Sequence, residues 1–493
     1  MELTIESQQF TKIATEALTT FVYEKDDKIE GVLAEVDAAT GGRLRELDAS
    51  GELTGKLLEM TLIHNPPGLS AKRLLLVGLG KPEKCTGREI LRASGAALRF
   101  LKTRSVRRMS VLAREQMRDA ASAQTVAEGL LLGEMESDIY KTEKKNGKQT
   151  EGVSLAGWPD DAAQKGRALG IVTATAQNFT RALVNEPSNK LTPRMLAERA
   201  ESMAREAGLA IEVFDENKIR ELKMGALLSV AQGSVEPPRF IVLTYTPPNH
   251  KQGAPVLGLV GKAVTFDTGG ISIKPADGME KMKYDMAGGA TMLGVMKALA
   301  QLKPAVKVVA CVPATENMPG GRAQKPGDVQ FAMSGKSIEV INTDAEGRLI
   351  LADGLTYARR AGCTHLIDAA TLTGAIVVAL SHVNVGVFGS EQGFTDRLLA
   401  SARACGEKMW PMPVDEEYRE MIKSGIADIQ NVGSGKGGGA VTAAMFLKEF
   451  SEETPWIHLD IAGTAWLDEA KPWSAKGASG VAVRTLIDVA MKF

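Results

Sequence analysis

One stretch of this 493-residue chain brings two carboxylates and a guanidinium together within five residues: Asn342-Thr343-Asp344-Ala345-Glu346-Gly347-Arg348-Leu349. It follows an alternating apolar pattern over 337–341, which predicts a strand, and precedes a helical pattern over 349–361. The charged residues are therefore predicted to lie on a strand-to-helix turn. Because Asp344 and Glu346 are two residues apart, their oxygens can point at one spot, where they repel each other unless a proton or a metal ion intervenes.

The same residues also allow a plainer interpretation. Asn342 and Asp344 are typical caps of a helix N-terminus, Gly347 suits a turn, and Arg348 could form a surface ion pair. Such sequences are common at helix starts, so this stretch alone supports both interpretations.

A second stretch, over 256–286, favours a functional site. It opens with an apolar run typical of a buried parallel strand and then breaks into glycines, and ligands of open α/β sheets bind beyond the carboxyl ends of such strands. Lys262, Asp267, Lys274 and Asp285 lie there. A lysine is ordinarily a solvated surface residue, but these two lie among anions and glycines.

Together with Asp344 and Glu346, these residues form a set rich in oxygen ligands that contains neither histidine nor cysteine. Such a set suits Mg, Mn or Zn, and bridging carboxylates can hold two ions about 3.5 to 4 Å apart. The sequence thus favours a two-metal hydrolase.

At these residues the sequence resembles the leucyl aminopeptidase (cytosol aminopeptidase) family of dinuclear metallopeptidases. The resemblance covers 342–349, the four spaced residues between 262 and 285, and 368–374, which reads Asp-Ala-Ala-Thr-Leu-Thr-Gly. It implies a metal-dependent aminopeptidase that removes N-terminal residues, preferably Leu, Met and other apolar ones, from short peptides. It also implies a homohexamer.

The resemblance implies a role for each residue. One metal ion, Mn or Zn, would be held by Asp267, Asp344 and Glu346, and a second by Lys262, Asp267, Asp285 and Glu346. Lys262 would have to be neutral, although an ordinary lysine has a pKa of about 10.4, so the ions must displace its proton. Lys274 would stabilise the oxyanion, and Arg348 would hold a bicarbonate ion that shuttles the proton.

Only the resemblance assigns a pocket for the first side chain of the substrate: Met282, Thr371, Gly374, Ala462 and Ala465. Ala465 stands where some relatives have methionine, so the fine selectivity is not defined by the sequence. Met282 could equally be an ordinary core residue.

Composition bounds the remaining possibilities. A hydrophobic content of 44% over this length is ample for two or three domains, and a formal net charge of −1 gives no global signal for nucleic acid or membrane. The N-terminus lacks the phases of a secretory signal, and no apolar run approaches the roughly 20 residues that cross a bilayer. We therefore expect a cytoplasmic protein whose four cysteines are structural thiols.

Alternating strand and helix patterns predict an α/β fold with two α/β domains joined by a long helix. An N-terminal domain is expected over 1–160, with strands at 73–77 and 109–112 and a helix at 89–101. A linker helix is expected within 161–190, and a catalytic domain over 191–493. The catalytic domain should contain a mostly parallel sheet flanked by helices, with strands at 306–312, 365–369 and 456–461.

Other interpretations stay open. A DNA-binding regulatory role on a peptidase fold is the alternative, for which the polar loop 141–148 could contribute positive charge. A two-metal phosphoesterase would share the carboxylates without needing a free amine. His365, His382 and His458 lie in apolar surroundings, where a hydrogen-bonded core histidine is favoured over a metal ligand.

Overall fold

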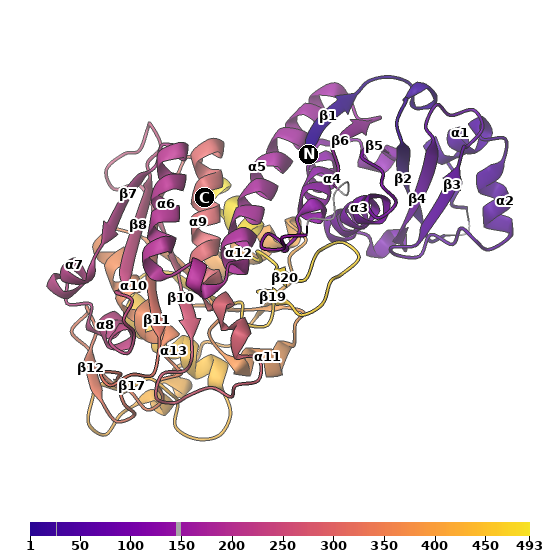
Figure 1. Ribbon diagram of the computed structural model, residues 1–493. Helices are drawn as coiled ribbons and strands as arrows, with labels where there is room; N and C mark the ends of the chain where they lie inside the picture. The colour runs from indigo at the N-terminus through magenta and orange to yellow at the C-terminus, as the bar shows by residue number, and fades with distance from the viewer. Residues whose placement is uncertain (26, 144–148) are drawn as a thin grey trace. The chain divides into compact units, whose positions relative to one another are not determined.

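The computed structural model describes residues 1–25, 27–143 and 149–493, and the chain forms two compact units (Figure 1). The first comprises Met1–Asn178 and the short segment Asp468–Lys476, and the second comprises Phe179–Leu467 and Gly477–Phe493. The border between them falls within helix α5, Asp160–Asn185, where the sequence predicted a long helix. The α/β class is confirmed, whereas the domain borders at 160 and 190 stay a prediction.

The first unit is built on a six-stranded sheet with the order β1-β6-β5-β2-β4-β3. Its strands are parallel except for β3, which pairs antiparallel with β4. The strand bounds are Glu2–Glu6 (β1), Ala17–Tyr23 (β2), Met60–His64 (β3), Arg73–Gly80 (β4), Arg108–Leu112 (β5) and Gly152–Ala156 (β6).

The helices of this unit are α1 (Val32–Ala39), α2 (Arg43–Ala49), α3 (Gly87–Lys102) and α4 (Ala120–Glu134). The predicted elements at 73–77, 89–101 and 109–112 are all present, as β4, α3 and β5. Helix α3 begins at a capping box. The Thr86 side chain accepts from a backbone N–H of the first turn, and the Glu89 side chain accepts from the backbone N–H of Thr86. Its buried face then packs on α4 and β4.

The second unit carries the main sheet, with the order β16-β15-β18-β14-β9-β11-β8-β7 and β10 paired beside β11. Its central strands are parallel, as predicted, and antiparallel pairs occur at β15-β18, β11-β8 and β8-β7. The strand bounds are Ala210–Phe214 (β7), Arg239–Tyr245 (β8), Val256–Gly261 (β9), Ala263–Asp267 (β10), Lys307–Asn317 (β11), His365–Ala370 (β14), Val385–Gly389 (β15), Met409–Pro411 (β16) and Trp456–Asp460 (β18).

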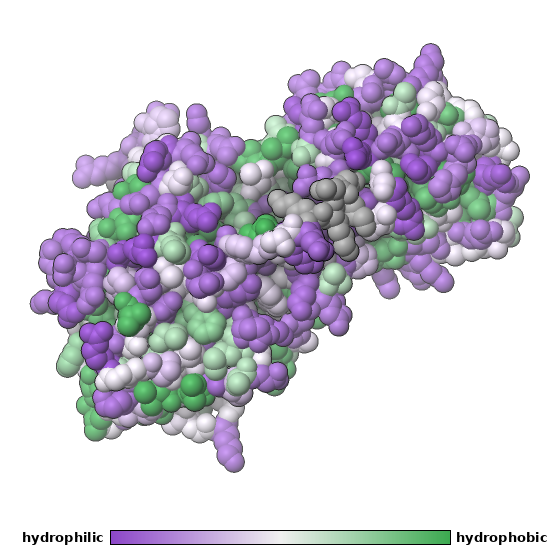
Figure 2. Space-filling view, in the orientation of Figure 1, coloured by the Kyte–Doolittle hydropathy of each residue, from purple (hydrophilic) through white to green (hydrophobic). Residues whose placement is uncertain are grey.

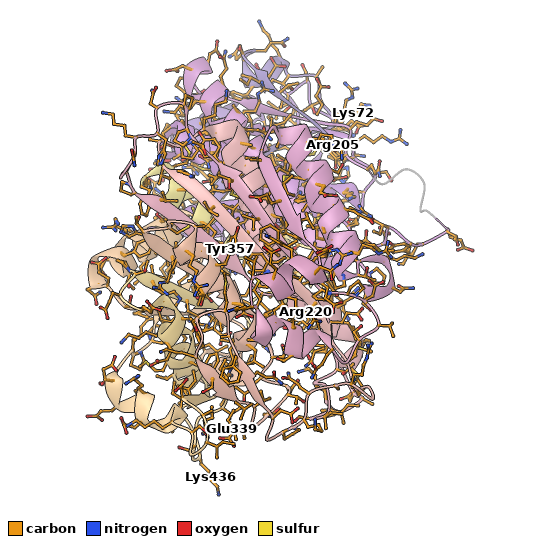
Figure 3. All side chains as sticks on the ribbon, turned by 90° about the vertical axis from the view of Figure 1, so that its left-hand side faces the viewer. Lys72, Arg205, Arg220, Glu339, Tyr357 and Lys436 are labelled. Atoms are coloured by element: carbon orange, nitrogen blue, oxygen red, sulfur yellow. The ribbon has the colours of Figure 1, made fainter. Side chains whose placement is uncertain are left out.

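Helices cover both faces of this sheet. On one face, α8 (Gly225–Ala231), α10 (Gly347–Arg360) and α13 (Gly439–Ser451) pack around a large apolar cluster that includes Phe240, Phe446 and Trp456. Tyr357 of α10, labelled in Figure 3, is partly buried and its ring packs edge-on against Phe240. The other face is covered by α6 (Pro193–Ala207), α9 (Ala287–Leu302), α12 (Gln392–Ala404) and α14 (Val483–Met491).

The remaining elements are short. Helices α7 (Glu216–Glu221) and α11 (Gly374–Leu380), a small sheet of β12 (Val329–Phe331), β13 (Ser337–Glu339) and β17 (Ile429–Gln430), and the pair β19 (Trp466–Leu467) and β20 (Gly477–Ala478) complete the unit. The strand predicted over 337–341 is thus only three residues long and lies outside the main sheet. Among the described residues, no helix combines the length and the apolar composition that a bilayer crossing requires.

Three central strands end side by side, and this alignment positions the site. Ala369 is paired with Gly261, and Ala370 with Asp460, so Lys262, Thr371 and Ile461 follow their strands at one edge of the sheet. Helix α9 begins directly against this edge. A side chain at Gly288 would bring its Cβ within 1.9 Å of the Ala369 carbonyl oxygen, so only glycine allows this approach.

A buried carboxylate ties α10 to its neighbours. Asp353 accepts hydrogen bonds from the backbone N–H of Leu227 on α8 (2.8 Å) and of Met333 after β12 (2.7 Å). Burial raises the pKa of Asp353 to about 7, although these backbone donors favour the charged form. The folded protein therefore binds this proton more tightly than the unfolded chain, in which an aspartate has a pKa of about 3.9.

This shift predicts a pH-dependent stability. Between about pH 4 and 7 the folded state holds the proton that the unfolded state has lost, so the contribution of Asp353 to stability should fall as the pH rises. In the Asp353→Asn variant this slope should be absent. The thermal unfolding midpoint of the wild type, measured relative to that of the variant, should thus be higher at pH 5 than at pH 7.5. An equal difference at both pH values would contradict the assignment.

Candidate metal centre

Four carboxylates from separate elements meet at the edge where the strands end. Asp267 is the last residue of β10, Asp285 lies in the 3-10 helix Met279–Met286, Asp344 is in the loop before α10, and Glu346 is its N-cap. Asp267, Asp344 and Glu346 each place one oxygen so that all three atoms lie within 4.8 Å of one another. Asp267 and Glu346 are 2% and 1% exposed.

Two lysines lie among these carboxylates. Lys262 Nζ is 2.7 Å from Asp285 Oδ2 and 2.8 Å from Glu346 Oε1, and it donates to the Thr371 carbonyl oxygen at 3.0 Å. Lys274 Nζ is 2.8 Å from Asp267 Oδ2 and also forms an ion pair with Asp344. The sequence-predicted metal ligands and Lys274 are therefore brought together in one cluster.

The cluster is crowded as well as charged. A side chain at Gly347 would place its Cβ 2.6 Å from the Lys262 Cε atom, so the end of the lysine side chain would have to move from its present position among the carboxylates. The motif glycine thus serves the approach of helix and lysine, and its backbone does not have a positive φ.

The carboxylates shift the acid–base properties of both lysines. Burial alone would lower the pKa of Lys262, but the neighbouring Asp285, Glu346 and Asp267 outweigh burial and raise it. The pKa of Lys274 is raised in the same way against burial, first of all by Asp267. Burial and like charge in turn raise the pKa values of Asp285 and Glu346.

Polar residues that the sequence interpretation missed hold the cluster in place. Asn317, the last residue of β11, donates to Asp267 Oδ1 (2.8 Å) and to the Thr343 carbonyl oxygen (3.1 Å). Asn431 accepts from the backbone N–H of Ile341 (2.7 Å) and donates to the Asn342 carbonyl oxygen (2.7 Å). The strand predicted over 306–312 stops five residues before Asn317, so the sequence pattern marks neither Asn317 nor Asn431.

Arg348 is buried directly after the cluster. Its Nη1 donates to the Asn431 carbonyl oxygen at 2.6 Å, while its buried Nε has no hydrogen-bond partner among the described residues. Burial lowers the pKa of Arg348 to about 10, and the nearby carboxylates of Glu346 and Asp460 oppose this shift. The guanidinium therefore keeps donor capacity that protein groups do not use.

A cavity of about 350 Å³ opens onto the cluster. Of the residues predicted for the substrate pocket, Met282, Thr371, Gly374 and Ala462 line this cavity. Ala465 is not among the lining residues and is buried. Leu372 and Val377 add apolar surface to the wall, a contribution that the sequence interpretation did not include.

Comparison with known proteins decides the family. The sequence matches the description "Cytosol aminopeptidase family, catalytic domain" over residues 178–487 and "Cytosol aminopeptidase family, N-terminal domain" over residues 20–144. The chain belongs to the cytosol aminopeptidase family. The resemblance read from the motif residues is thereby confirmed, and with it a metal-dependent aminopeptidase activity.

Relatives in the cytosol aminopeptidase family match along the whole chain. A protein of Solibacter usitatus named "Probable cytosol aminopeptidase" is 56% identical over 491 residues, covering 100% of this chain and 99% of that protein. A protein of Koribacter versatilis with the same name is 50% identical, covering 100% of both chains.

Solved structures agree. A mutant of tomato leucine aminopeptidase superposes with a TM-score of 0.90 at 34% identity, covering 100% of this chain and 97% of that one. The bottromycin maturation enzyme BotP in complex with Mn superposes with a TM-score of 0.85 at 32% identity, covering 97% of this chain and 99% of that one.

Proposed function

We propose that the protein uses two divalent metal ions, Mn or Zn, to remove N-terminal residues from short peptides, with a preference for Leu, Met and other apolar residues. The observation that carries this proposal is the cluster of four carboxylates and two lysines, which opens onto a cavity lined in part by apolar side chains. In a family of aminopeptidases, such a cluster is the natural centre of the reaction.

The residues of the cluster fit divalent cations. The four carboxylates carry two more charges than Lys262 and Lys274 compensate. Asp285 Oδ2 and Glu346 Oε1 are buried without a hydrogen bond, although both lie within ion-pair distance of Lys262. One ion would be held by Asp267, Asp344 and Glu346, and the other by Lys262, Asp267, Asp285 and Glu346, with Lys262 neutral in the loaded site.

When bound, such ions supply a Lewis acid for the scissile carbonyl and an activated water. Lys274, which is not assigned as a metal ligand, can donate as an ammonium to the oxyanion that develops on the substrate. The free α-amine of a peptide would be a ligand for such an ion. An internal peptide nitrogen is a poor ligand, which explains an exopeptidase.

The cavity accounts for an apolar first residue. The apolar part of its lining consists of Met282, Leu372, Val377 and Ala462. Binding removes an apolar substrate side chain from water against these surfaces, which favours the complex. Ala465, assigned to this pocket by resemblance, is buried and is not among the residues that line the cavity.

Arg348 is proposed to hold bicarbonate as the proton shuttle. Its free Nε and its burial beside the cluster suit a small planar oxyanion, which a guanidinium binds through two parallel hydrogen bonds. In the described part of the chain, none of the five histidines belongs to the cluster of acidic residues at the site. A bound anion is therefore a reasonable general base for the reaction.

We further propose a cytoplasmic homohexamer that admits only short peptides. Apolar side chains on and beside the small β12-β13-β17 sheet, Phe331 at 62% and Ile426 at 69% exposure, suit a contact between copies of the chain. Figure 2 shows apolar surface at this end of the second unit. Light scattering coupled to size exclusion measures the assembly, and an active monomer at micromolar concentration would refute it.

The DNA-binding alternative receives no support. Of the polar loop 141–148, residues 144–148 lie outside the described part of the chain, and the formal net charge is −1. Lys436, in the glycine-rich stretch 433–439, points away from the body of the second unit (Figure 3).

The proposal is tested by hydrolysis of a leucyl anilide with and without added Mn²⁺, alongside an N-acetylated leucyl anilide and a phosphate ester. We expect manganese-dependent cleavage of the free-amine substrate alone. Cleavage of the phosphate ester instead would replace the peptidase with a phosphoesterase.

Metal stoichiometry should separate the two kinds of ligand. Asp285→Asn should mainly empty one site, whereas Glu346→Gln should impair both, because Glu346 lies within reach of both halves of the cluster. Elemental analysis of the purified variants measures this. Glu449→Gln, which changes a buried carboxylate paired with Lys336 outside the site, serves as the control. Wild-type metal content in both site variants would remove the assignment.

Lys274→Ala should lower kcat by roughly 10² to 10³-fold with little change in KM, which is the pattern for loss of one oxyanion donor. Metal content should stay at the wild-type level, since Lys274 is not assigned as a ligand. Lys336→Ala removes an ammonium of similar burial elsewhere in the second unit and should leave kcat unchanged. A rise in KM alone in Lys274→Ala would assign the lysine to substrate binding.

Bicarbonate should accelerate the wild type in carbonate-depleted buffer, and Arg348→Ala should lose that response. Arg348→Lys keeps the charge but lacks the planar fork, so it should recover only part of the response. Initial rates measured against bicarbonate concentration decide the point. A wild-type rate indifferent to bicarbonate would count against this mechanism.

A further inference from the structure

Three buried ionisable side chains lie on neighbouring strands behind the cavity wall. Asp368 of β14 is the register partner of His458 on β18, and Asp460 lies two residues further along β18 on the same face. All three are at most 1% exposed. Neither the metal cluster nor the proposed chemistry uses them.

Asp460 holds the two chain segments that leave these strands. Its Oδ1 accepts from the backbone N–H of Leu372 and of Ala462, both at 3.2 Å, and its Oδ2 accepts from the Thr373 hydroxyl at 2.7 Å. The same hydroxyl accepts from the Ile376 N–H at 3.1 Å and so caps α11. One carboxylate thus links the segment after β14, the segment after β18 and the start of α11.

Both segments form the wall of the substrate cavity. Leu372, Thr373, Gly374 and Ala462 line it. Thr371 lies directly before them. Its hydroxyl donates to Asp285 Oδ1 at 2.6 Å, and its carbonyl oxygen accepts from Lys262. The wall is therefore fixed at one end by the cluster and at the other by Asp460.

A buried charge in this position requires compensation, and the neighbours provide it. Burial raises the pKa of Asp460, while the His458 imidazole and the three hydrogen bonds oppose that rise. His458 Nδ1 is 2.6 Å from Asp368 Oδ1, and Asp368 Oδ2 accepts from the Trp456 indole at 2.6 Å. Burial would lower the pKa of His458, but Asp368, which is hydrogen-bonded to its ring, and then Asp460 raise it.

We propose that Asp460 is a positioning residue that fixes the wall of the substrate cavity through Leu372, Thr373 and Ala462 and thereby sets which first side chain the enzyme accepts. The inference rests on the proposed aminopeptidase function. Asp460 touches neither the reacting bond nor the metal ligands, so it acts through the backbone of Leu372 and Ala462. Its loss should change selectivity more than the chemical step.

The test compares Asp460→Asn with Asp353→Asn. Both substitutions turn a buried carboxylate that accepts backbone N–H bonds into an amide, but only Asp460 contacts the cavity wall. We measure kcat and KM for leucyl and alanyl anilides with Mn²⁺, together with metal content and the unfolding midpoint. One methylene in an apolar pocket is worth about tenfold or more in discrimination.

In Asp460→Asn the leucyl-to-alanyl ratio of kcat/KM should fall about tenfold, mainly through KM for the leucyl substrate, with metal content as in the wild type. Asp353→Asn should keep the wild-type ratio whatever its stability. An unchanged ratio in a folded, metal-loaded Asp460→Asn overturns the inference and leaves the aminopeptidase function standing. A wild type without activity on either anilide overturns the proposed function instead.

A second pair keeps the inference testable if Asp460→Asn does not fold. Thr373→Val removes the hydroxyl that donates to Asp460 while preserving the shape of the side chain. This variant should lower the leucyl-to-alanyl ratio of kcat/KM, as Asp460→Asn does. Thr373→Ser restores the hydroxyl and should recover most of the loss. Equal ratios in the valine and serine variants would overturn the inference, because the hydroxyl would then not matter.

Discussion

The structure depends on negative charge buried where parallel strands end. Asp267, Asp285 and Glu346 are almost fully removed from water, and a buried carboxylate is costly unless a cation or hydrogen-bond donors face it. Lys262 and Lys274 supply two such cations, and Asn317 supplies a donor. The sheet supports this arrangement because the register of β9, β14 and β18 brings the first residues after each strand to one edge.

The same constraint recurs one layer deeper. Asp460 and Asp368 are also buried carboxylates, and each is met by hydrogen-bond donors: Asp368 by His458 and the Trp456 indole, and Asp460 by Leu372, Thr373 and Ala462. The prediction that His458 is a hydrogen-bonded core histidine is confirmed, and its partner Asp368 is one that the apolar sequence around it did not indicate.

The sequence predicted the charged site well because its chemistry is encoded locally. The spacing of residues within 262–285 and 342–349 identifies the carboxylates and lysines. The alignment of the strand ends is then enough to bring these side chains together. The supporting residues could not be predicted in this way. Asn431 bonds to backbone about 90 residues earlier in the chain, and Asp460 bonds to Leu372 across 88 residues, so only the fold shows their roles.

Fold prediction failed where tertiary packing overrides local pattern. The alternation over 337–341 predicted a strand, but the segment continues only three residues as β13 and pairs with β12 and β17. Helix α10 begins at Gly347, two residues before the predicted start, and Gly347 lies directly against Lys262. The order of the strands in the main sheet could not be predicted either. Its eight-strand path mixes antiparallel with parallel pairs, and the hydrophobic periodicity of the sequence does not encode which strands are neighbours.

The segment Asp468–Lys476 belongs to the first unit although the chain on both sides of it belongs to the second. Within the first unit its Trp473 ring lies 4.3 Å from the guanidinium carbon of Arg92, so an indole from the far end of the chain completes the surface of α3. The two units are therefore not consecutive modules of the gene. A fragment that begins at α6 would carry this indole without its arginine, and one that stops at α5 would lack it. A domain exchange that keeps this contact must move both stretches of the chain together.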